Sequence, residues 1–357
     1  MRKIYFTCVL FCIVSFIYIQ TPSYADVNKS QTVETVLLGA NVTKLSGEKY
    51  QTTFALWSPD TSKVQLWLNG KTYPMTNHEL YISTDLDSTV YYVSIPKNCS
   101  LEPYHFIVNG ISVQDPYARM IDLNWKSTDY TQNDIVISSY DVLPVTLTEP
   151  KFVNKTDAVI YEANVRDFTV DSNSGVSKGL NGTYTGMIEL KTVYTDSTGV
   201  LYKTGFDHLK QLGISYIQIM PFYEYGTCTV ADMMKNSKEY DWGYDPVNYN
   251  VPEWLYSKYN TTISDNGAKL PDLDNIHYLD RIKEVQNMIH QFHVNGMRVI
   301  MDVVYNHTFS KDVLGNITDK YYTAKDHSGC GNSLDVSNPM VSRMVLDSLK
   351  YWVRKHK

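Results

Sequence analysis

The stretch GMRVIMDVVYNH, residues 296–307, decides the fold class of this 357-residue sequence. Apolar residues run through it almost without a break up to Val304, as is typical of a strand buried on both faces in a parallel sheet covered by helices. Two similar runs lie upstream, AVIYEA at 158–163 and ISYIQIM at 214–220. Together they predict three parallel strands.

Helical patterns lie between and after these runs. We expect helices over 205–212 and 278–294, and a third that begins at Asn338-Pro339, where an N-cap residue precedes a proline in the first helical position. The alternation of strands and helices predicts an α/β unit over 151–357. The second and third helices carry apolar stripes: Ile282, Val285, Ile289 and Phe292 in one, and Val341, Val345, Leu349 and Trp352 in the other.

The N-terminal part has a different pattern, in which short strands are separated by turns. TTFALW (52–57) ends at Ser-Pro-Asp, while KVQLWL (63–68) and YHFIV (104–108) each end at Asn-Gly. Strands of this length with such turns predict an antiparallel β-sandwich, which we assign to 26–125. A stretch rich in Ser, Thr and Asp, 126–150, is interpreted as a linker to the α/β domain.

The first 25 residues have the three regions of a secretory signal peptide. Arg2 and Lys3 precede an apolar run over 4–19, and small residues follow up to Ala25. A membrane anchor is the alternative, but a run of about 16 residues is short for a span of about 20. We therefore expect cleavage after Ala25, a secreted extracellular protein, and no membrane association afterwards.

The composition excludes several classes of protein. A hydrophobic content of 43% excludes a disordered chain, and a formal charge of −6 without a run of like charges argues against nucleic-acid binding. Cys-x-x-Cys, His-x-x-x-His and glycine-rich nucleotide motifs are absent, so we expect no zinc site and no nucleotide cofactor. The 29 Tyr residues suit stacking on sugar rings as well as ordinary core packing.

Two segments carry the candidate binding residues. Asp302 closes an apolar strand, where a carboxylate is costly unless it is paired or hydrogen-bonded. The alternative is that Asp302 merely caps a turn. YDWGYDP, residues 240–246, lies in a long loop after the second strand, and long loops in compact domains are often functional. Its three aromatic residues around Gly243 suit either a sugar platform or loop packing.

Four motifs resemble those of a known enzyme family. DVVYNH (302–307) resembles the first conserved region of the α-amylase superfamily of glycoside hydrolases. YDWGYDP is similar to the signature of type I pullulanases, which usually have Asn in place of Asp241, and YEANVRDF (161–168) resembles their first barrel strand, with Asn164 where His is frequent. FALWSP (54–59) and DPYA (115–118) resemble markers of a family 48 carbohydrate-binding module.

The resemblance implies a hydrolase that cleaves α-1,6 branch bonds in pullulan, starch or glycogen with retention of configuration, acts as a monomer and uses no metal. In such an enzyme Tyr244 stacks on a sugar ring, His307 binds its hydroxyl groups, Asp302 pairs with an Arg on the fourth strand, and Asn306 shapes the loop. The full set of expected substrate-binding residues is Tyr240, Trp242, Tyr244, Asp245, Asp302, Asn306 and His307.

The resemblance also implies that the chain is a fragment. In this family the catalytic carboxylates follow the fourth, fifth and seventh strands of a TIM-type (β/α)8 barrel, whereas 151–357 supplies about three strand–helix units. We therefore expect the catalytic residues beyond Lys357 and no activity from this chain alone. The alternatives are a non-catalytic α-glucan-binding protein and a fragment of an isoamylase-like or branching enzyme, although the Trp-Gly-Tyr cluster favours a pullulanase.

Overall fold

The computed structural model describes residues 37–81, 87–122, 133–142, 150–151, 154–227, 241–259, 261–263, 269–271 and 277–355. From Leu37 onward these residues belong to one compact unit. The expected signal peptide and Tyr240 lie outside the described residues. Within those ranges, no helix combines the length and apolar character that crossing a bilayer requires.

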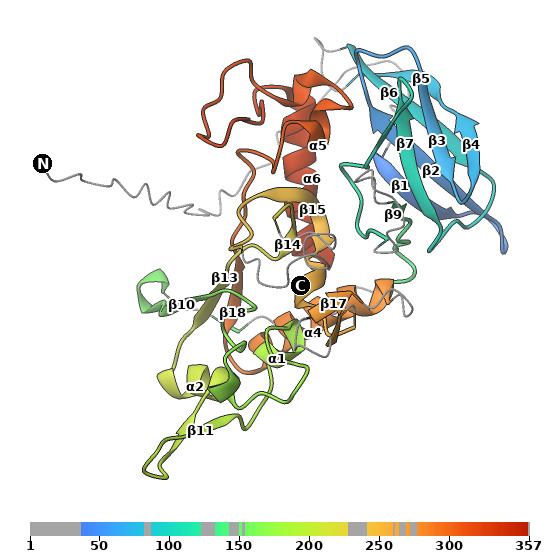
Figure 1. Ribbon diagram of the computed structural model, residues 1–357. Coiled ribbons are helices and arrows are strands. Elements are labelled where there is room, and N and C mark those ends of the chain that lie inside the picture. Colours follow the sequence, from blue (N-terminus) through green and yellow to red (C-terminus); the bar gives the residue numbers. More distant parts are fainter. Residues whose placement is uncertain are drawn as a thin grey trace, which may run out of the picture. The chain divides into compact units, whose positions relative to one another are not determined.

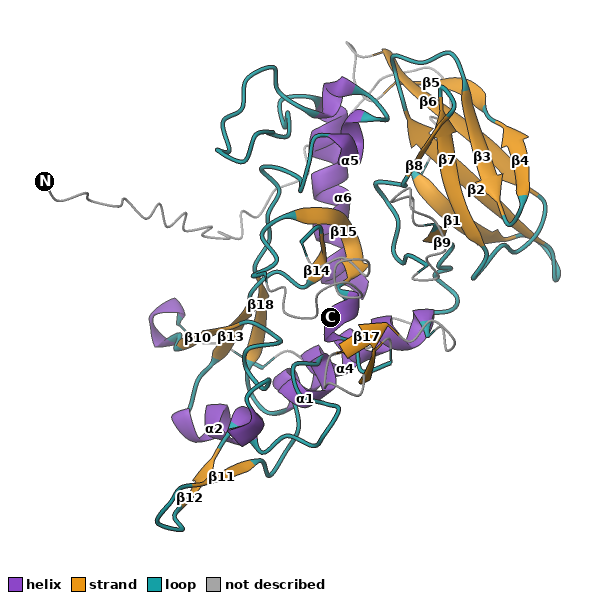
Figure 2. Ribbon diagram, in the orientation of Figure 1, coloured by secondary structure: helices purple, strands orange, loops and turns teal. Residues whose placement is uncertain are grey.

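Two antiparallel sheets form the N-terminal half (Figures 1 and 2). The first has the order β1-β2-β6-β5, with β1 at Gly39–Lys44, β2 at Tyr50–Trp57, β5 at Thr76–Tyr81 and β6 at Asp87–Ile95. The second has the order β4-β3-β7-β8, and β9 also pairs with β7; the strands are β3 Val64–Leu68, β4 Lys71–Pro74, β7 Pro103–Val108, β8 Ile111–Val113 and β9 Asp134–Ile135.

Alternating side chains join the two sheets into a sandwich. In β3 and β7 every second residue is buried, and the Phe54 ring of β2 meets the Tyr104 ring of β7 edge to face at 5.1 Å. The predicted Asn69-Gly70 and Asn109-Gly110 turns both have positive φ at each residue, as tight hairpin turns require. The expected antiparallel strands are thus present, and β9, which falls within the stretch interpreted as a linker, adds to their second sheet.

The predicted parallel strands are also present, in the order β10-β13-β18. They are β10 Ile160–Ala163, β13 Tyr216–Ile219 and β18 Arg298–Met301. The expectation that they are buried on both faces is wrong, because Ile160 is 52% exposed and all of β18 is only half-buried. One face carries the buried Ile217 and Ile219, whereas the polar Gln218 points to the other.

The predicted helix bounds are confirmed. Helix α2 spans Gly205–Leu212, α4 spans Tyr278–Val294 and α6 spans Pro339–Lys355. The α4 stripe is fully buried, but in α6 Leu349 is 38% exposed, while Met344 and Ser348 occupy the buried face with Val341 and Trp352. The other helices within the described residues are short: α1 Tyr184–Met187, α5 Asp312–Gly315, and 3-10 turns at Lys155–Asp157, Ser172–Ser174, Trp254–Tyr256 and Asp319–Tyr321.

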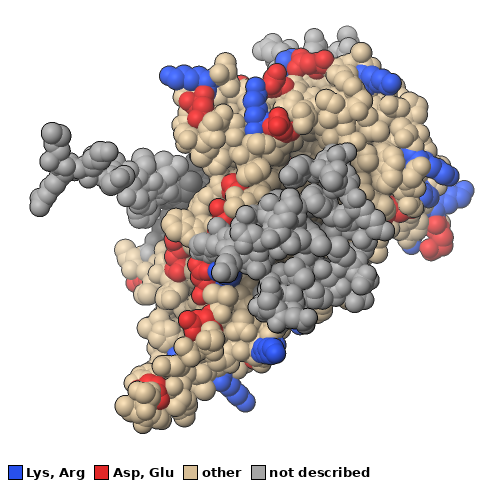
Figure 3. All heavy atoms as spheres, in the orientation of Figure 1, with Lys and Arg blue, Asp and Glu red and all other residues tan. Residues whose placement is uncertain are grey.

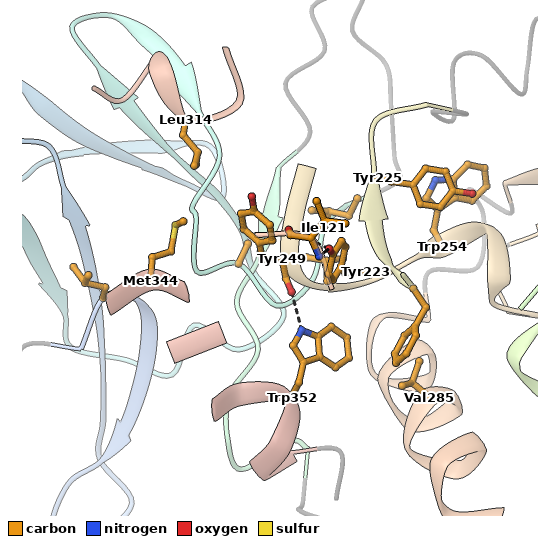
Figure 4. Close-up of a cluster of buried hydrophobic side chains, with 14 of the residues drawn as sticks. Ile121, Tyr223, Tyr225, Tyr249, Trp254, Val285, Leu314, Met344 and Trp352 are labelled. Carbon is orange, nitrogen blue, oxygen red and sulfur yellow. Dashed lines mark hydrogen bonds between the residues drawn. The ribbon is translucent and has the colours of Figure 1, made fainter. Parts of the chain in front are cut away.

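Three hairpins of the α/β part were not expected from the sequence. They pair β11 Val193–Thr195 with β12 Leu201–Lys203, β14 Tyr223–Tyr225 with β15 Pro246–Pro252, and β16 Thr261–Ile263 with β17 Lys269–Pro271. The β14–β15 pair matters for the site because β15 begins directly after the YDWGYD segment. Helix α6 packs on β15, and the Trp352 indole donates a 2.7 Å hydrogen bond to the Tyr249 carbonyl (Figure 4).

A buried charge cluster lies between α4 and the β14–β15 hairpin, which carries Glu224 in β14 and Glu253 directly after β15. Arg281 of α4 is 1% exposed, and its guanidinium donates to the backbone carbonyls of Pro252 and Ile121, each at 3.3 Å. Glu224 and Glu253 both lie close enough to Arg281 to interact electrostatically with it. Burial raises the pKa of Glu224 to about 7 and the pKa of Glu253 to about 8. At neutral pH this cluster therefore holds a carboxyl proton as well as the guanidinium charge.

The first sheet also contacts the α/β part. The Trp57 ring at the end of β2 meets Tyr321 edge to face at 4.9 Å, and the Ser58 hydroxyl donates to the Ile317 carbonyl at 3.2 Å. Asp60 accepts a 2.5 Å hydrogen bond from Thr318. On the face drawn in Figure 3, the described Lys and Arg side chains lie apart rather than in one basic patch.

Candidate functional site

A pocket of about 780 Å³ opens where two of the parallel strands end. Asn164 follows β10 and Met220 follows β13, and the carboxyl ends of parallel strands are the usual place for binding sites in α/β proteins. Its volume lies in the ordinary range for a small-molecule site. The lining residues are Tyr161, Glu162, Ala163, Asn164, Asp167, Phe168, Met220, Trp242 and Tyr244.

Tyr244 and Asp302 form the polar contact at this edge of the sheet. The Tyr244 hydroxyl donates a 2.7 Å hydrogen bond to Oδ2 of Asp302, which directly follows β18. The Asp302 backbone N–H donates to the Ile219 carbonyl at 2.9 Å, so the residue continues the sheet. Burial, followed by this bond to the carboxylate, raises the pKa of Tyr244, so the phenol keeps its proton and stays a donor.

A tight turn presents Trp242 and Tyr244 to the pocket. Asp241 Oδ1 accepts a 2.6 Å hydrogen bond from the Gly243 N–H, and Gly243 has φ +88°. A Cβ on Gly243 would lie 2.7 Å from the Pro221 carbonyl oxygen, so this position admits only glycine without movement of the backbone. Trp242 remains 58% exposed at the rim.

Asp245 holds the turn rather than lining the pocket. Its Oδ2 accepts hydrogen bonds from the Thr227 N–H at 2.7 Å and the Thr227 hydroxyl at 2.6 Å. Its backbone carbonyl accepts from the Gly226 N–H at 2.9 Å. Burial, with the neighbouring Asp241 carboxylate, raises the pKa of Asp245 to about 6. Asp245 thus anchors the segment that presents Tyr244.

Asn306 and His307 lie beside the pocket without lining it. His307 is buried, its Nδ1 lies 2.9 Å from Asn306 Oδ1, and its carbonyl accepts a 2.9 Å hydrogen bond from the Tyr249 hydroxyl. Burial lowers the pKa of His307, although a hydrogen bond with the Tyr244 backbone opposes that shift. At neutral pH the His307 ring is therefore uncharged, and it lies next to the backbone of Tyr244.

The segment from Tyr161 to Phe168 contributes most of the lining, yet sequence reasoning did not propose it as a site. Asn164 Oδ1 accepts from the N–H groups of Arg166 and Asp167, at 2.9 and 3.2 Å, and so closes the turn after β10. Glu162 accepts a 2.9 Å hydrogen bond from Gln218 of the neighbouring strand. The available signal was the YEANVRDF motif, which spans the end of β10 and the turn after it and so lies at the same edge of the sheet as Asp302.

No cluster of three or more His, Cys, Asp or Glu side chains suited to a metal occurs within the ranges that the structure describes. Cys99 and Cys330 are free thiols, buried and exposed respectively.

We expect Gly243→Ala to lower the free energy of unfolding by at least about 2 kcal/mol, because the new Cβ adds a clash with Pro221 to the strain of a positive φ. Gly199→Ala is the matched control, since Gly199 has φ +85° but no atom within 4 Å of the added Cβ. Its expected loss is about 1 kcal/mol. Urea denaturation of both variants measures the difference, and equal losses would show that the contact with Pro221 costs nothing.

Comparisons with known proteins relate this fold and site to glycoside hydrolases. Pullulanase A of Streptococcus pneumoniae serotype 2 is 30% identical to this chain, over 90% of the chain and 26% of its own length. The pullulanase of Bacillus subtilis is 25% identical over 85% of the chain and 40% of its own length. Isoamylase 3 of Oryza sativa subsp. japonica is 30% identical over 57% of the chain. No protein-family model matches the chain.

Solved structures give the same result. The pullulanase from Bacillus acidopullulyticus superimposes with a TM-score of 0.70 and 31% identity, over 94% of this chain and 38% of its own. A pullulanase from Anoxybacillus sp., complexed with maltotetraose, has a TM-score of 0.70 and 28% identity over 89% of this chain and 43% of its own. The chain is therefore pullulanase-like in sequence and fold, as its motifs indicate, and spans less than half the length of these relatives.

Proposed function

We propose that the chain binds α-glucans in the pocket beside Tyr244, as the substrate-binding part of a debranching glycoside hydrolase. The expected reaction is hydrolysis of α-1,6 linkages in pullulan, starch or glycogen with retention of configuration. The observation that carries the proposal is the Tyr244–Asp302 hydrogen bond beside an aromatic pocket at the carboxyl ends of parallel strands. The maltotetraose in the related Anoxybacillus structure supports the same substrate class.

In this proposal Tyr244 and Asp302 have positioning roles. The hydrogen bond fixes the phenol ring, whose face can then stack on a sugar ring. Asp302 Oδ1 remains able to accept a hydrogen bond from a sugar hydroxyl or from a cationic side chain. Trp242, more than half exposed, offers a second aromatic face at the rim.

We further propose that this chain by itself binds glucan without hydrolysing it. A retaining glycosidase needs a nucleophile and an acid about 5 Å apart. The proposal gives the carboxylates described around the pocket hydrogen-bonding roles and no catalytic one: Asp302 accepts from Tyr244, Glu162 from Gln218 and Asp167 from Arg166. In the proposal the catalytic pair belongs to further strands of a (β/α)8 barrel that begins with β10, β13 and β18.

We prefer the pullulanase hypothesis to the isoamylase hypothesis, because the similarity to the pullulanase extends over 90% of the chain and the similarity to the isoamylase over 57%. The N-terminal sequence supports secretion after cleavage at Ala25, and the sandwich is proposed to be a carbohydrate-binding-module-like domain. We propose a monomer.

The proposal is tested by titrating the purified chain with maltotetraose in a calorimeter. Tyr244→Ala should weaken binding about 10-fold or more, because it removes both the stacking face and the donor that orients Asp302. Tyr202→Ala is the control, since Tyr202 is 50% exposed on the β11–β12 hairpin and does not line the pocket. Equal losses in the two variants, or no binding by the unmodified chain, would refute the proposal.

The second part of the proposal predicts that the chain releases no reducing sugar from pullulan under conditions in which it binds maltotetraose. Release that disappears in Asp302→Ala would show that the chain is a complete hydrolase.

A further inference from the structure

The hydrogen bond between Tyr244 and Asp302 joins two segments of the chain that one hairpin contacts. Tyr244 belongs to the YDWGYD segment, which continues directly into β15, and Asp302 begins the DVVYNH segment after β18. Because β15 pairs with β14, the β14–β15 hairpin carries the first of these segments. The same hairpin also bonds to the second segment, through the hydroxyl groups of Tyr223 in β14 and Tyr249 in β15.

Tyr223 bonds to both backbone groups of Val304. Its hydroxyl accepts a hydrogen bond from the Val304 N–H and donates one to the Val304 carbonyl at 3.2 Å. Val304 is buried, and buried backbone groups are costly when they have no partner. The Asp302 N–H still bonds to the Ile219 carbonyl of the neighbouring strand, whereas two residues later both backbone groups turn to Tyr223. The Tyr223 hydroxyl therefore fixes the path along which the chain leaves the sheet.

Tyr249 holds the other end of the DVVYNH segment. Its hydroxyl donates to the His307 carbonyl at 2.9 Å, and the His307 ring in turn hydrogen-bonds with the Tyr244 backbone. The Tyr223 and Tyr249 rings meet edge to face with centroids 5.9 Å apart (Figure 4). Both rings are buried, and burial raises the pKa of each phenol, so both keep their protons at neutral pH. Two neutral hydroxyls of one hairpin thus hold this segment at two points.

We propose that Tyr223 and Tyr249 are positioning residues for glucan binding, because their hydroxyl groups fix the backbone of residues 302–307 so that Asp302 meets Tyr244 before the ligand arrives. This inference rests on the proposed function, since it takes the pocket beside Tyr244 to be the ligand site. Neither Tyr223 nor Tyr249 lines the pocket, so each acts on the ligand only through the residues that it holds. The β14–β15 hairpin thereby determines affinity as well as packing against α6.

The test titrates maltotetraose into tyrosine-to-phenylalanine variants, which lose one hydroxyl and keep the ring. Tyr223→Phe and Tyr249→Phe should each weaken binding about 5-fold, within the range that a lost hydrogen bond gives. Tyr91→Phe is the matched control, since Tyr91 is also buried and its hydroxyl donates to a backbone carbonyl, that of Thr61, at 2.6 Å. It should bind maltotetraose like the unmodified chain. Melting temperatures establish that each variant is folded.

A double-mutant cycle with Tyr244→Phe separates positioning from a general loss of structure. Tyr244→Phe keeps the stacking ring but removes the bond to Asp302, so the placement that Tyr223 maintains no longer serves that bond. In the Tyr244→Phe background, Tyr223→Phe should weaken binding by less than about 2-fold, whereas independent losses would multiply. In the ligand-free chain, amide hydrogen exchange over residues 302–307 should be faster in Tyr223→Phe than in Tyr91→Phe.

The outcomes separate the two proposals. If the unmodified chain binds maltotetraose and either site variant binds it equally well, the positioning role of that tyrosine is refuted while the proposed function stands. Losses that multiply in the cycle, or a loss of the same size in Tyr91→Phe, would mean that these hydroxyls stabilise the fold without positioning Asp302. If the unmodified chain does not bind maltotetraose, both proposals fail.

Discussion

Arg281→Met lowers the free energy of unfolding by about 3–5 kcal/mol at pH 8, the usual cost of removing one partner from a buried ion pair. The guanidinium is the cation that faces Glu224 and Glu253, and it also satisfies the Pro252 and Ile121 carbonyls. Methionine has a similar volume, but it leaves the two carboxyls without a counter-charge and the two carbonyls without a hydrogen-bond donor. The loss should shrink toward pH 5.5, because both carboxyls then carry protons and need no counter-charge.

Urea denaturation at pH 5.5 and pH 8 measures both effects. Lys283→Met is the control on the same helix, since the Lys283 side chain is 57% exposed and forms only a surface pair with Asp280. Its expected change is below about 1 kcal/mol at either pH. A loss for Arg281→Met that does not depend on pH would mean that packing, not charge, is what Arg281 contributes.

Trp352→Ala is expected to cost about 3–5 kcal/mol, the range for truncating a large buried aromatic residue. Trp352 is 7% exposed, packs edge to face on Phe222 at 5.4 Å, and donates its indole hydrogen bond to Tyr249 (Figure 4). The variant therefore loses the packing of α6 on β15 and leaves the Tyr249 carbonyl without this donor. Figure 4 shows Trp352 and Tyr249 within one cluster that also contains Tyr223.

Circular dichroism follows this unfolding, because removing a tryptophan alters fluorescence independently of stability. Val353→Ala, one residue away and 52% exposed, serves as the control and should change stability by less than about 0.5 kcal/mol. Similar losses in the two variants would show that the inner face of α6 contributes little to the fold.

The elements with strong local signals are the ones that the sequence predicts well. Helices α2 and α4 begin and end where the apolar period begins and ends, and the Asn-Gly turns fix their own backbone conformation. The β14–β15 hairpin was missed because its strands lie 20 residues apart along the chain and pair with irregular register. Their sequences contain Pro246 and Pro252, which argue against a strand when read locally.

The site could be predicted only in part for a related reason. Trp242 and Tyr244 can be recognised as candidates because they belong to an aromatic-rich loop. The strand order of the sheet, which local sequence does not show, decides which other loop at the strand ends shares their pocket. The family resemblance implies an Arg partner for Asp302, and the sequence cannot reveal that Tyr244 donates to it, because the two residues are 58 positions apart. Asp245, expected to bind substrate, follows Tyr244 directly, but its carboxylate accepts hydrogen bonds from Thr227 and does not line the pocket.

The buried Glu224–Glu253–Arg281 cluster makes unfolding a proton-releasing reaction. Both carboxyls have ordinary pKa values near 4.5 when exposed, and values of about 7 and about 8 in the folded chain. Their stabilising contribution is complete below about pH 4.5 and is lost as pH rises through 7 and 8. Near neutral pH these two carboxyls therefore carry less negative charge in the folded chain than in the unfolded one. The heat absorbed on melting will accordingly differ between phosphate and Tris, since the two buffers take up the released protons with different enthalpies.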